Sequence, residues 1–301
     1  SVSSSSSSSS SPNLCTLQIE RIHGMLRKGW ESNTTEESLN SLQVRLSPYH
    51  VFHVLKSFPS DAISALNFFT WAAKQRGYKH TTTTYNIMIH VLGKDYKFEA
   101  IKNLLELMKR SGCEFNEVTF NIVISSYGRA GMIKEARATF DQMSFFRCAP
   151  TTYTYNLLLH FLFRADLYDV AKSTFVAMMS SDCSPNSFTL STLIHGLCKA
   201  GSHMDAFRVF SVLSGHGCEP DVVAYTCLIN GLCRAGYIDE ALHLKSDMRR
   251  HGVQPNRYTF NSLIAGLCKV GKVHHTGPLL LEMVGIGGNP DTCTYNILLK
   301  A

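Results

Sequence analysis

Apolar residues recur with the spacing of an amphipathic helix inside a block that spans residues 222–256. With about 100° between successive residues, one face of the first predicted helix is apolar, made of Tyr225, Leu228, Ile229 and Leu232. Asp221 can cap this helix at its start, and Gly236 can end it. A second helix is predicted from about Ile238 to Arg250, because acidic residues lie in its first turn and basic residues in its last. The block is therefore predicted to be a helix-turn-helix unit.

The same block recurs at a fixed period of 35 residues. Regular units start at residues 82, 117, 152, 187, 222 and 257, and residues 292–301 begin a seventh unit that is cut off. The last three complete units each contain LI-x-G-LC-[KR]-x-G near their start. Self-similarity at a period of this size predicts a stacked array in which each unit packs on its neighbours. The predicted fold class is all-α, an α-solenoid of 35-residue helix-turn-helix repeats with a concave inner face.

The chain outside the regular units is more variable. Residues 47–81 form a divergent unit with two amphipathic stretches, which we interpret as an N-terminal capping repeat. Residues 1–46 are predicted to be a Ser-rich disordered start, a basic amphipathic stretch and a polar connector at 31–46. A Ser-rich, acid-poor start of this kind is typical of an organelle transit peptide, and the alternative is a disordered tail without a function. In the unit at 257, Gly277 and Pro278 predict a kink in the second helix.

Composition adds limits to this picture. The 301 residues are 45% hydrophobic and carry a net charge of +6, a modest preference for anionic partners. No apolar run approaches 18 residues, so no membrane span is expected. The ten cysteines include two periodic sets, Cys113, Cys148, Cys183 and Cys218 in one and Cys198, Cys233 and Cys268 in the other. Because no CxxC pair and no zinc-like histidine spacing occurs, they are interpreted as packed or surface thiols, and neither a metal nor a cofactor is expected.

A second stripe on the first helix contains the same kinds of side chain in every unit. The second residue, here called the clamp row, is Thr83, Val118, Tyr153, Phe188, Val223 and Tyr258. The fifth residue is Asn86, Asn121, Asn156, Ser191, Thr226 and Asn261. The residue that closes each unit is Asn116, Thr151, Asn186, Asp221, Asn256 and Asp291, and it forms a reading pair with the fifth residue of its unit. A cation row near the helix end is Lys94, Arg129, Arg164, Lys199, Arg234 and Lys269.

These rows have two interpretations. Small polar residues at helix starts can be caps, and basic residues at helix ends can oppose the helix dipole. Dipole compensation would also tolerate a basic residue at a neighbouring position, yet one position is basic in all six units. The rows suit a single-stranded nucleic acid, since cations meet phosphates, flat or branched side chains sandwich bases, and amides or hydroxyls contact base edges. Six engaged cations would give a salt slope of about −4.

At these residues the chain resembles the pentatricopeptide repeat family, in its plant organellar class built only of 35-residue units (the P class). The resemblance rests on VVAYTCLINGLCRAGYIDEAL, RYTFNSLIAGLCKVGKV and the closing segments GVQPN and GCEPD, and it covers about residues 82–301. It implies a right-handed superhelix that binds single-stranded RNA with one nucleotide per repeat and the 5′ end at the N-terminal repeats. It also implies an organellar location, with the mitochondrion preferred to the plastid, and a role in RNA processing, stability, splicing or translation.

The resemblance further implies a base for each reading pair. In the family, Ser or Thr with Asp favours guanine, Thr with Asn adenine, Asn with Asp uracil, and Asn with Asn a pyrimidine. Transferred to this chain, the pairs predict the core 5′-YYYGAU-3′, in which Ser191 with Asp221 contacts G. Asn121 with Thr151 is a rarer pair, assigned to a pyrimidine. Thr83 departs from the usual apolar clamp, which weakens the first contact.

Two other classes of function remain as alternatives. A protein-binding scaffold is the main one, because the 34-residue tetratricopeptide repeat holds peptides with the same helix pairs. The 35-residue period, the polar fifth residues and the cation row argue against it. Enzymatic action is the other, but no nucleophile triad, paired carboxylates, phosphate-binding glycine loop or deaminase signature appears. No catalytic residue, small-molecule substrate or membrane partner is therefore predicted for this stretch, and a catalytic segment beyond residue 301 stays open.

Overall fold

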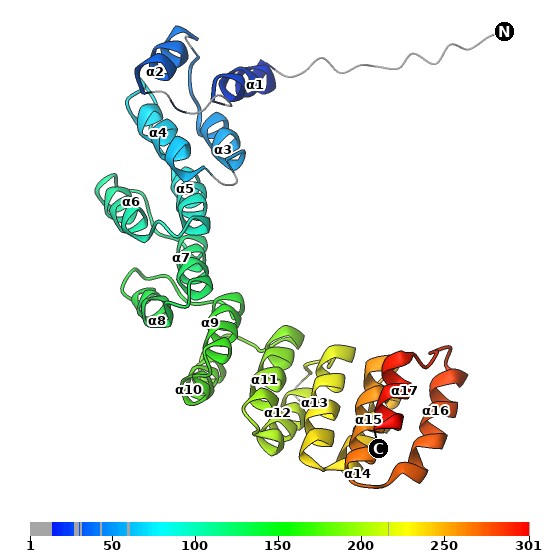
Figure 1. Cartoon of the computed structure of the whole chain (residues 1–301). Helices are drawn as coiled ribbons and strands as arrows, with labels where there is room; N and C mark the ends of the chain where they lie inside the picture. Colours follow the sequence, from blue (N-terminus) through cyan, green and yellow to red (C-terminus); the bar gives the residue numbers. More distant parts are fainter. Residues whose placement is uncertain are drawn as a thin grey trace, which may run out of the picture. The chain divides into compact units, whose positions relative to one another are not determined.

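The computed structural model describes residues 14–26, 30, 32–42, 44–58, 61–215 and 217–300. These residues contain helices and turns but no strand, and they divide into two compact units, one up to residue 149 and one from residue 150. Within each unit, short helices follow one another as antiparallel pairs (Figure 1). The predicted class, an all-α solenoid of helix-turn-helix repeats, is confirmed. None of the described helices is long and apolar enough to span a membrane.

The first unit contains eight helices in its described part. They are α1 (Leu14–Leu26), α2 (Ser32–Ser41), α3 (Pro48–Lys56), α4 (Ala62–Ala73), α5 (Thr82–Lys94), α6 (Phe98–Arg110), α7 (Glu117–Arg129) and α8 (Ile133–Gln142). The pair α3 and α4 lies in the segment interpreted as a capping repeat, and α3 packs against α5. Helices α5 and α7, the first helices of their repeats, pack against each other, while α6 packs on α5 and α8 on α7, both on the left of these helices in Figure 1.

The second unit continues the same alternation. Its described helices are α9 (Thr152–Arg164), α10 (Tyr168–Met179), α11 (Ser187–Lys199), α12 (His203–Gly215), α13 (Val222–Ala235), α14 (Ile238–Arg250), α15 (Arg257–Lys269), α16 (Thr276–Gly285) and α17 (Thr292–Leu299), with a 3₁₀ turn at Val273–His275 before α16. Helices α9, α11, α13, α15 and α17 pack on one another in order, so the first helices form one continuous layer. The helices predicted at 222–256 are confirmed, and Gly236 ends α13 in the left-handed conformation, with φ of 90°.

In each of the two compact units, the hydrophobic core lies between the two helices of a repeat and the first helix of the next repeat. In α13 the predicted apolar seam is fully buried, at Tyr225, Leu228, Ile229 and Leu232. Successive first helices approach closely at glycines near their ends, because a Cβ on Gly196 would overlap the Phe163 ring and one on Gly266 would lie 2.7 Å from Cys233 Cβ.

Two local features go beyond the sequence predictions. The polar connector expected at residues 31–46 contains a helix, α2, over 32–41. Its Leu39 is buried and its Asn40 Oδ1 accepts a 3.0 Å hydrogen bond from Trp71 Nε1, so tertiary packing holds a segment of polar composition as a helix. Pro278 does not kink a second helix, because the 3₁₀ turn precedes α16 and places this proline in its first turn. No N–H of a first turn has an intrahelical partner, so the missing donor costs nothing there.

Candidate nucleic-acid interface

The closing residues are the N-caps of the helices that follow them. A side-chain oxygen of each accepts from the backbone N–H of the third residue in the next first helix, as Asn116 does from Thr119 at 3.0 Å and Asp221 from Ala224 at 2.7 Å. The same contact is present at Thr151, Asn186, Asn256 and Asp291. The capping interpretation of these residues is therefore right as far as it goes. Capping also holds each side chain at a fixed place beside the preceding first helix.

The structure brings fifth and closing residues together as pairs. Asn86 Nδ2 donates to Asn116 Oδ1 at 3.2 Å, and Asn156 Nδ2 donates to Asn186 Oδ1 at the same distance. Ser191 Oγ donates to Asp221 Oδ1 at 3.3 Å. No direct hydrogen bond joins Thr226 to Asn256 or Asn261 to Asp291 among the described residues. The remaining pair, Asn121 and Thr151, is divided between the two units.

The clamp row is exposed beside these pairs. Val118, Phe188, Val223 and the tyrosines Tyr153 and Tyr258 all present roughly half or more of their surface to solvent. In the first unit a pocket of about 290 Å³ is lined by two successive clamp residues, Thr83 and Val118, and by the reading pair Asn86 and Asn116. Residues predicted from their periodicity alone therefore meet around one hollow. The hollow therefore combines β-branched side chains with amide groups that can donate and accept hydrogen bonds.

A second hollow of about 350 Å³ lies between α9 and α11. It combines the clamp residue Phe188, the fifth residue Ser191 and the cations Arg164 and Lys199 with two histidines, His160 and His195. Burial and the nearby Arg164 guanidinium lower the pKa of His160, which keeps this imidazole neutral at pH 7. The lining therefore combines an aromatic face, a hydroxyl and fixed positive charge, groups that suit a base and the phosphate beside it.

The cation row is exposed along its whole length, but its members differ. Among the described residues, Lys94, Arg129, Arg164 and Arg234 make no ion pair. Lys199 Nζ lies 2.8 Å from Asp166 Oδ1, and Lys269 Nζ donates to the Arg234 carbonyl at 2.7 Å. The hydrogen bond from Lys199 lowers the pKa of Asp166, and the same bond raises the pKa of Lys199. Four of the six cations are thus directly available to an anion.

Sequence reasoning missed two charged partners at this face. Asp166 in the turn after α9 pairs with the cation row, and Arg257 Nη1 lies 3.1 Å from Asp291 Oδ2, while the Arg257 guanidinium lies 5.7 Å from the centre of the Tyr258 ring. The backbone N–H of Thr294, together with Arg257, lowers the pKa of Asp291, so this closing residue is ionised at pH 7. Neither residue recurs at 35-residue spacing, so periodicity could not have found it.

The periodic cysteines contribute packing. Burial raises the pKa of Cys198 and Cys233 to about 12, so both thiols are protonated and unreactive at pH 7. A Cβ atom on Gly231 would crowd Cys198, and one on Gly266 would crowd Cys233, which places both thiols in the seam between first helices. In the described part of the chain, no three His, Cys, Asp or Glu side chains cluster as metal ligands would.

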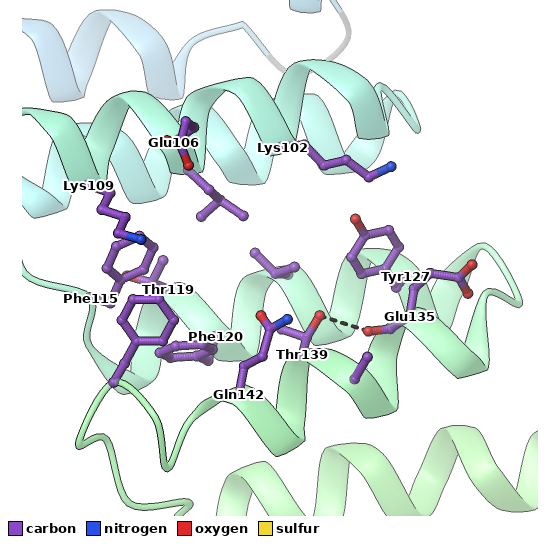
Figure 2. A pocket seen from close by; sticks show the side chains of 14 residues that line it. Lys102, Glu106, Lys109, Phe115, Thr119, Phe120, Tyr127, Glu135, Thr139 and Gln142 are labelled. Carbon is purple, nitrogen blue, oxygen red and sulfur yellow. Dashed lines mark hydrogen bonds between the residues drawn. The ribbon is translucent and has the colours of Figure 1, made fainter.

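A larger pocket of about 360 Å³ lies away from the clamp row, between α6, α7 and α8. Figure 2 shows Phe115 and Phe120 at one end of it and Tyr127 with Glu135 at the other, with Lys102 and Lys109 reaching from α6. The Phe115 and Phe146 rings are 4.7 Å apart, so this end is an aromatic cluster. Among the predicted interface residues none lines this pocket, which lies between two successive second helices and the first helix α7.

Comparison with known proteins matches the repeats. The family described as the PPR repeat family matches residues 80–126, 115–164, 150–199, 191–234, 220–269 and 259–301. A pentatricopeptide repeat-containing protein of Arabidopsis thaliana, named as mitochondrial, is 40% identical over 99 residues, which cover 33% of this chain and 19% of the relative. A second one from the same plant is 38% identical over 95 residues, 32% of this chain and 11% of the relative. The chain therefore aligns with less than a fifth of either relative.

Solved structures share the fold. The crystal structure of the pentatricopeptide repeat protein PPR10 from maize matches with a TM-score of 0.60 at 18% identity, over 95% of this chain and 48% of that one. PPR10 in complex with an 18-nt psaJ RNA element matches with a TM-score of 0.59 at 23% identity, over 95% and 44%. The PPR domain of Arabidopsis thaliana protein-only RNase P 1 in complex with tRNA gives 0.52 at 18% identity, over 59% and 93%.

Proposed function

Because the chain belongs to the pentatricopeptide repeat family, we propose that it binds single-stranded RNA and holds one nucleotide per repeat. The observation that carries the proposal is the hollow at Thr83, Asn86, Asn116 and Val118. Its lining includes the clamp residues of two successive repeats and a reading pair that is joined by a hydrogen bond. An unstacked base fits between such clamp residues, because every base has two flat faces, and its edge then meets the amides.

The reading pairs give a sequence to test. The bases assigned from the family resemblance are three pyrimidines, then G, A and U, in the order 5′-YYYGAU-3′. The acceptor-only carboxylates of Asp221 and Asp291 suit this order, because guanine and uracil each carry a ring N–H on the pairing edge, whereas the corresponding ring nitrogen of adenine, N1, is an acceptor. Asn256 closes the repeat assigned to adenine, and its amide can donate to a base nitrogen.

The structural relatives agree with this proposal. PPR10 has been crystallised with an 18-nt RNA element, and the PPR domain of protein-only RNase P 1 with tRNA. Several relatives are named as mitochondrial, which supports an organellar role in RNA processing, stability, splicing or translation for this chain. Within the described residues we assign no catalytic group, so RNA binding itself is the proposed activity.

Competition binding with the 301-residue chain tests the proposal. A labelled RNA that contains CCCGAU is bound in dilute salt and challenged with the same RNA, with a scrambled RNA of the same composition and with duplex DNA of the same sequence. Only the matched RNA is expected to compete well, and the logarithm of the affinity is expected to fall with that of salt with a slope of about −4 if all six cations engage. Equal competition by duplex DNA, or no RNA binding at all, would contradict the proposal and favour a protein-binding scaffold.

A further inference from the structure

A buried hydroxyl stands behind nearly every reading pair, at the third residue of the next first helix. This position is threonine in six of seven first helices, Thr84, Thr119, Thr154, Thr189, Thr259 and Thr294, and alanine in the other, Ala224. All seven side chains are essentially excluded from solvent. A buried hydroxyl needs a hydrogen-bond partner, because leaving it unpaired costs about 1–3 kcal/mol. Where these hydroxyls point therefore identifies their role.

Four of these hydroxyls point back to the fifth residue of the preceding repeat. Thr119 Oγ1 donates to Asn86 Oδ1 and Thr189 Oγ1 to Asn156 Oδ1, both at 2.7 Å. The same contact joins Thr294 to Asn261 at 2.8 Å and Thr259 to Thr226 at 2.9 Å. Each hydroxyl also lies near the closing residue that caps its own helix, at distances of 2.9 to 3.1 Å. In all four the fifth residue is the nearer of the two partners.

This contact fixes which way the fifth amide faces. With Oδ1 held by Thr189 and one Nδ2 hydrogen held by Asn186, the Asn156 amide has a single N–H left for a ligand. Rotating the amide by half a turn would place its NH₂ against the hydroxyl and lose both bonds as they stand. A free asparagine can turn either its oxygen or its NH₂ toward a base, whereas this one is held with Oδ1 against Thr189, so that an Nδ2 hydrogen is the donor left for a base. The threonine at the third position therefore sets which amide atom of the fifth residue faces the base, although the threonine itself does not contact the base.

The repeat with alanine provides the contrasting case. Its fifth residue is Ser191, whose hydroxyl donates to Asp221 Oδ1, and Ala224 stands where the other repeats have threonine. A hydroxyl rotates about one bond and can donate and accept from the same atom, so it needs no partner behind it to set its polarity. Asn86, Asn156 and Asn261 each have a threonine behind them. The contact is thus present behind three of the four fifth-residue asparagines and behind Thr226, and it is absent behind Ser191.

We propose that the threonine at the third position of a first helix, as at Thr119, Thr189, Thr259 and Thr294, is a positioning residue for base selection, which acts through the fifth residue of the preceding repeat. The inference rests on the proposed function, because it concerns how the same interface chooses a base. It adds a third side chain to each of these reading pairs, and that side chain belongs to the neighbouring repeat. Base choice at one repeat therefore depends on the start of the next.

Thr189→Val tests the proposal, because valine keeps the shape and removes the hydroxyl. The preference of the third RNA position for a pyrimidine, measured by competition with all four bases there, is expected to fall roughly fivefold, the order of one hydrogen bond. Preferences at the fourth to sixth positions are expected to stay. Thr189→Ser keeps a hydroxyl and is expected to retain the preference. Weaker binding to all four RNAs in the same ratio would overturn the proposal and leave Thr189 as a helix cap alone.

Installing the contact where it is absent gives an independent test. Ser191→Asn alone places an amide with no hydroxyl behind it, and weak base discrimination is expected at the fourth RNA position. Ser191→Asn combined with Ala224→Thr is expected to restore discrimination there roughly fivefold, in favour of uracil over guanine. Equal discrimination by both variants would refute the positioning role. If the wild-type chain bound no single-stranded RNA, the proposed function itself would fail, and that outcome is separate from either of these.

Discussion

The two ends of the first helices are built in opposite ways. At the start of α9, Asn156 is 4% exposed and hydrogen-bonded to both Asn186 and Thr189, so its amide has one orientation. At the end of the same helix, Arg164 is exposed and makes no ion pair among the described residues. Choosing a base requires donors and acceptors at fixed places, whereas attraction to a phosphate acts over several ångströms and tolerates mobile side chains. The difference predicts that one end sets specificity and the other sets affinity.

Neutralising the free cations is expected to have the largest effect. Replacing Lys94, Arg129, Arg164 and Arg234 together by glutamine removes the four cations that make no ion pair in the described part of the chain, so the salt slope should become shallower by about 2.8, at about 0.7 for each phosphate contact. Affinity should drop to a similar extent for matched and scrambled RNA, because phosphate contacts carry no sequence information. Binding titrations at several salt concentrations measure both quantities. A variant that lost its preference for the matched RNA but kept the salt slope of the wild-type chain would contradict this division between specificity and affinity.

The second-largest effect is expected from a substitution at Gly196 of α11, and it concerns the stability of the fold. Gly196→Ala places a methyl group into the buried Phe163 ring, and overpacking of this kind lowers the free energy of unfolding by about 1–3 kcal/mol. Urea unfolding followed by circular dichroism measures the change. Gly277→Ala is the matched control, because a Cβ there meets nothing within 4 Å. Equal stability of the two variants would mean that the seam between first helices is looser than the structure indicates.

Periodicity was sufficient to predict the fold and the residues that line the first hollow. The apolar spacing in residues 222–256 predicted both helices with their ends, because a helix that repeats must bury the same face each time. The capping residue Asp221 and the left-handed Gly236 were predicted from residue type alone. Periodicity also located the residues around the first hollow, since equivalent positions of neighbouring repeats lie side by side. The assigned bases and phosphate contacts stay predictions.

The remaining features depend on contacts that do not repeat. Asp166 pairs with Lys199 because the turn after α9 takes a left-handed residue at this aspartate, with φ of 58°, where most other repeats have glycine. Helix α2 has few apolar residues of its own and is held by Trp71 of α4, so local composition pointed to a connector. The threonines at the third helix position are periodic in the sequence, but the direction of their hydroxyls could not be inferred without coordinates.

Asp221→Asn is expected to change specificity with little change in affinity. The carboxylate accepts from Ser191 and from the N-terminus of α13, and an amide can keep the cap through its oxygen. Its NH₂ then faces the base as a donor, so the preference at the fourth RNA position should move from G toward A by about 1–3 kcal/mol, the range for a well-made contact to a base edge. Competition with RNAs that differ only at that position measures the shift. An unchanged preference there would contradict the assignment of this reading pair.

The smallest effect is expected where the cation row is already paired. Asp166→Asn removes the carboxylate 2.8 Å from Lys199 Nζ, so the ammonium group becomes available to a phosphate, and a nearby negative charge that repels RNA is lost. The salt slope should steepen by up to about 0.7, with a few-fold gain in affinity that is the same for matched and scrambled RNA. Asp169→Asn is the control, because Asp169 is an exposed carboxylate of α10 without an ion pair in the described residues, and its loss changes the net charge equally. An equal gain in affinity from both variants would assign the effect to the change in net charge rather than to Lys199. The cations at the end of the first helix would then attract RNA through the net charge of the protein and not through individual phosphate contacts.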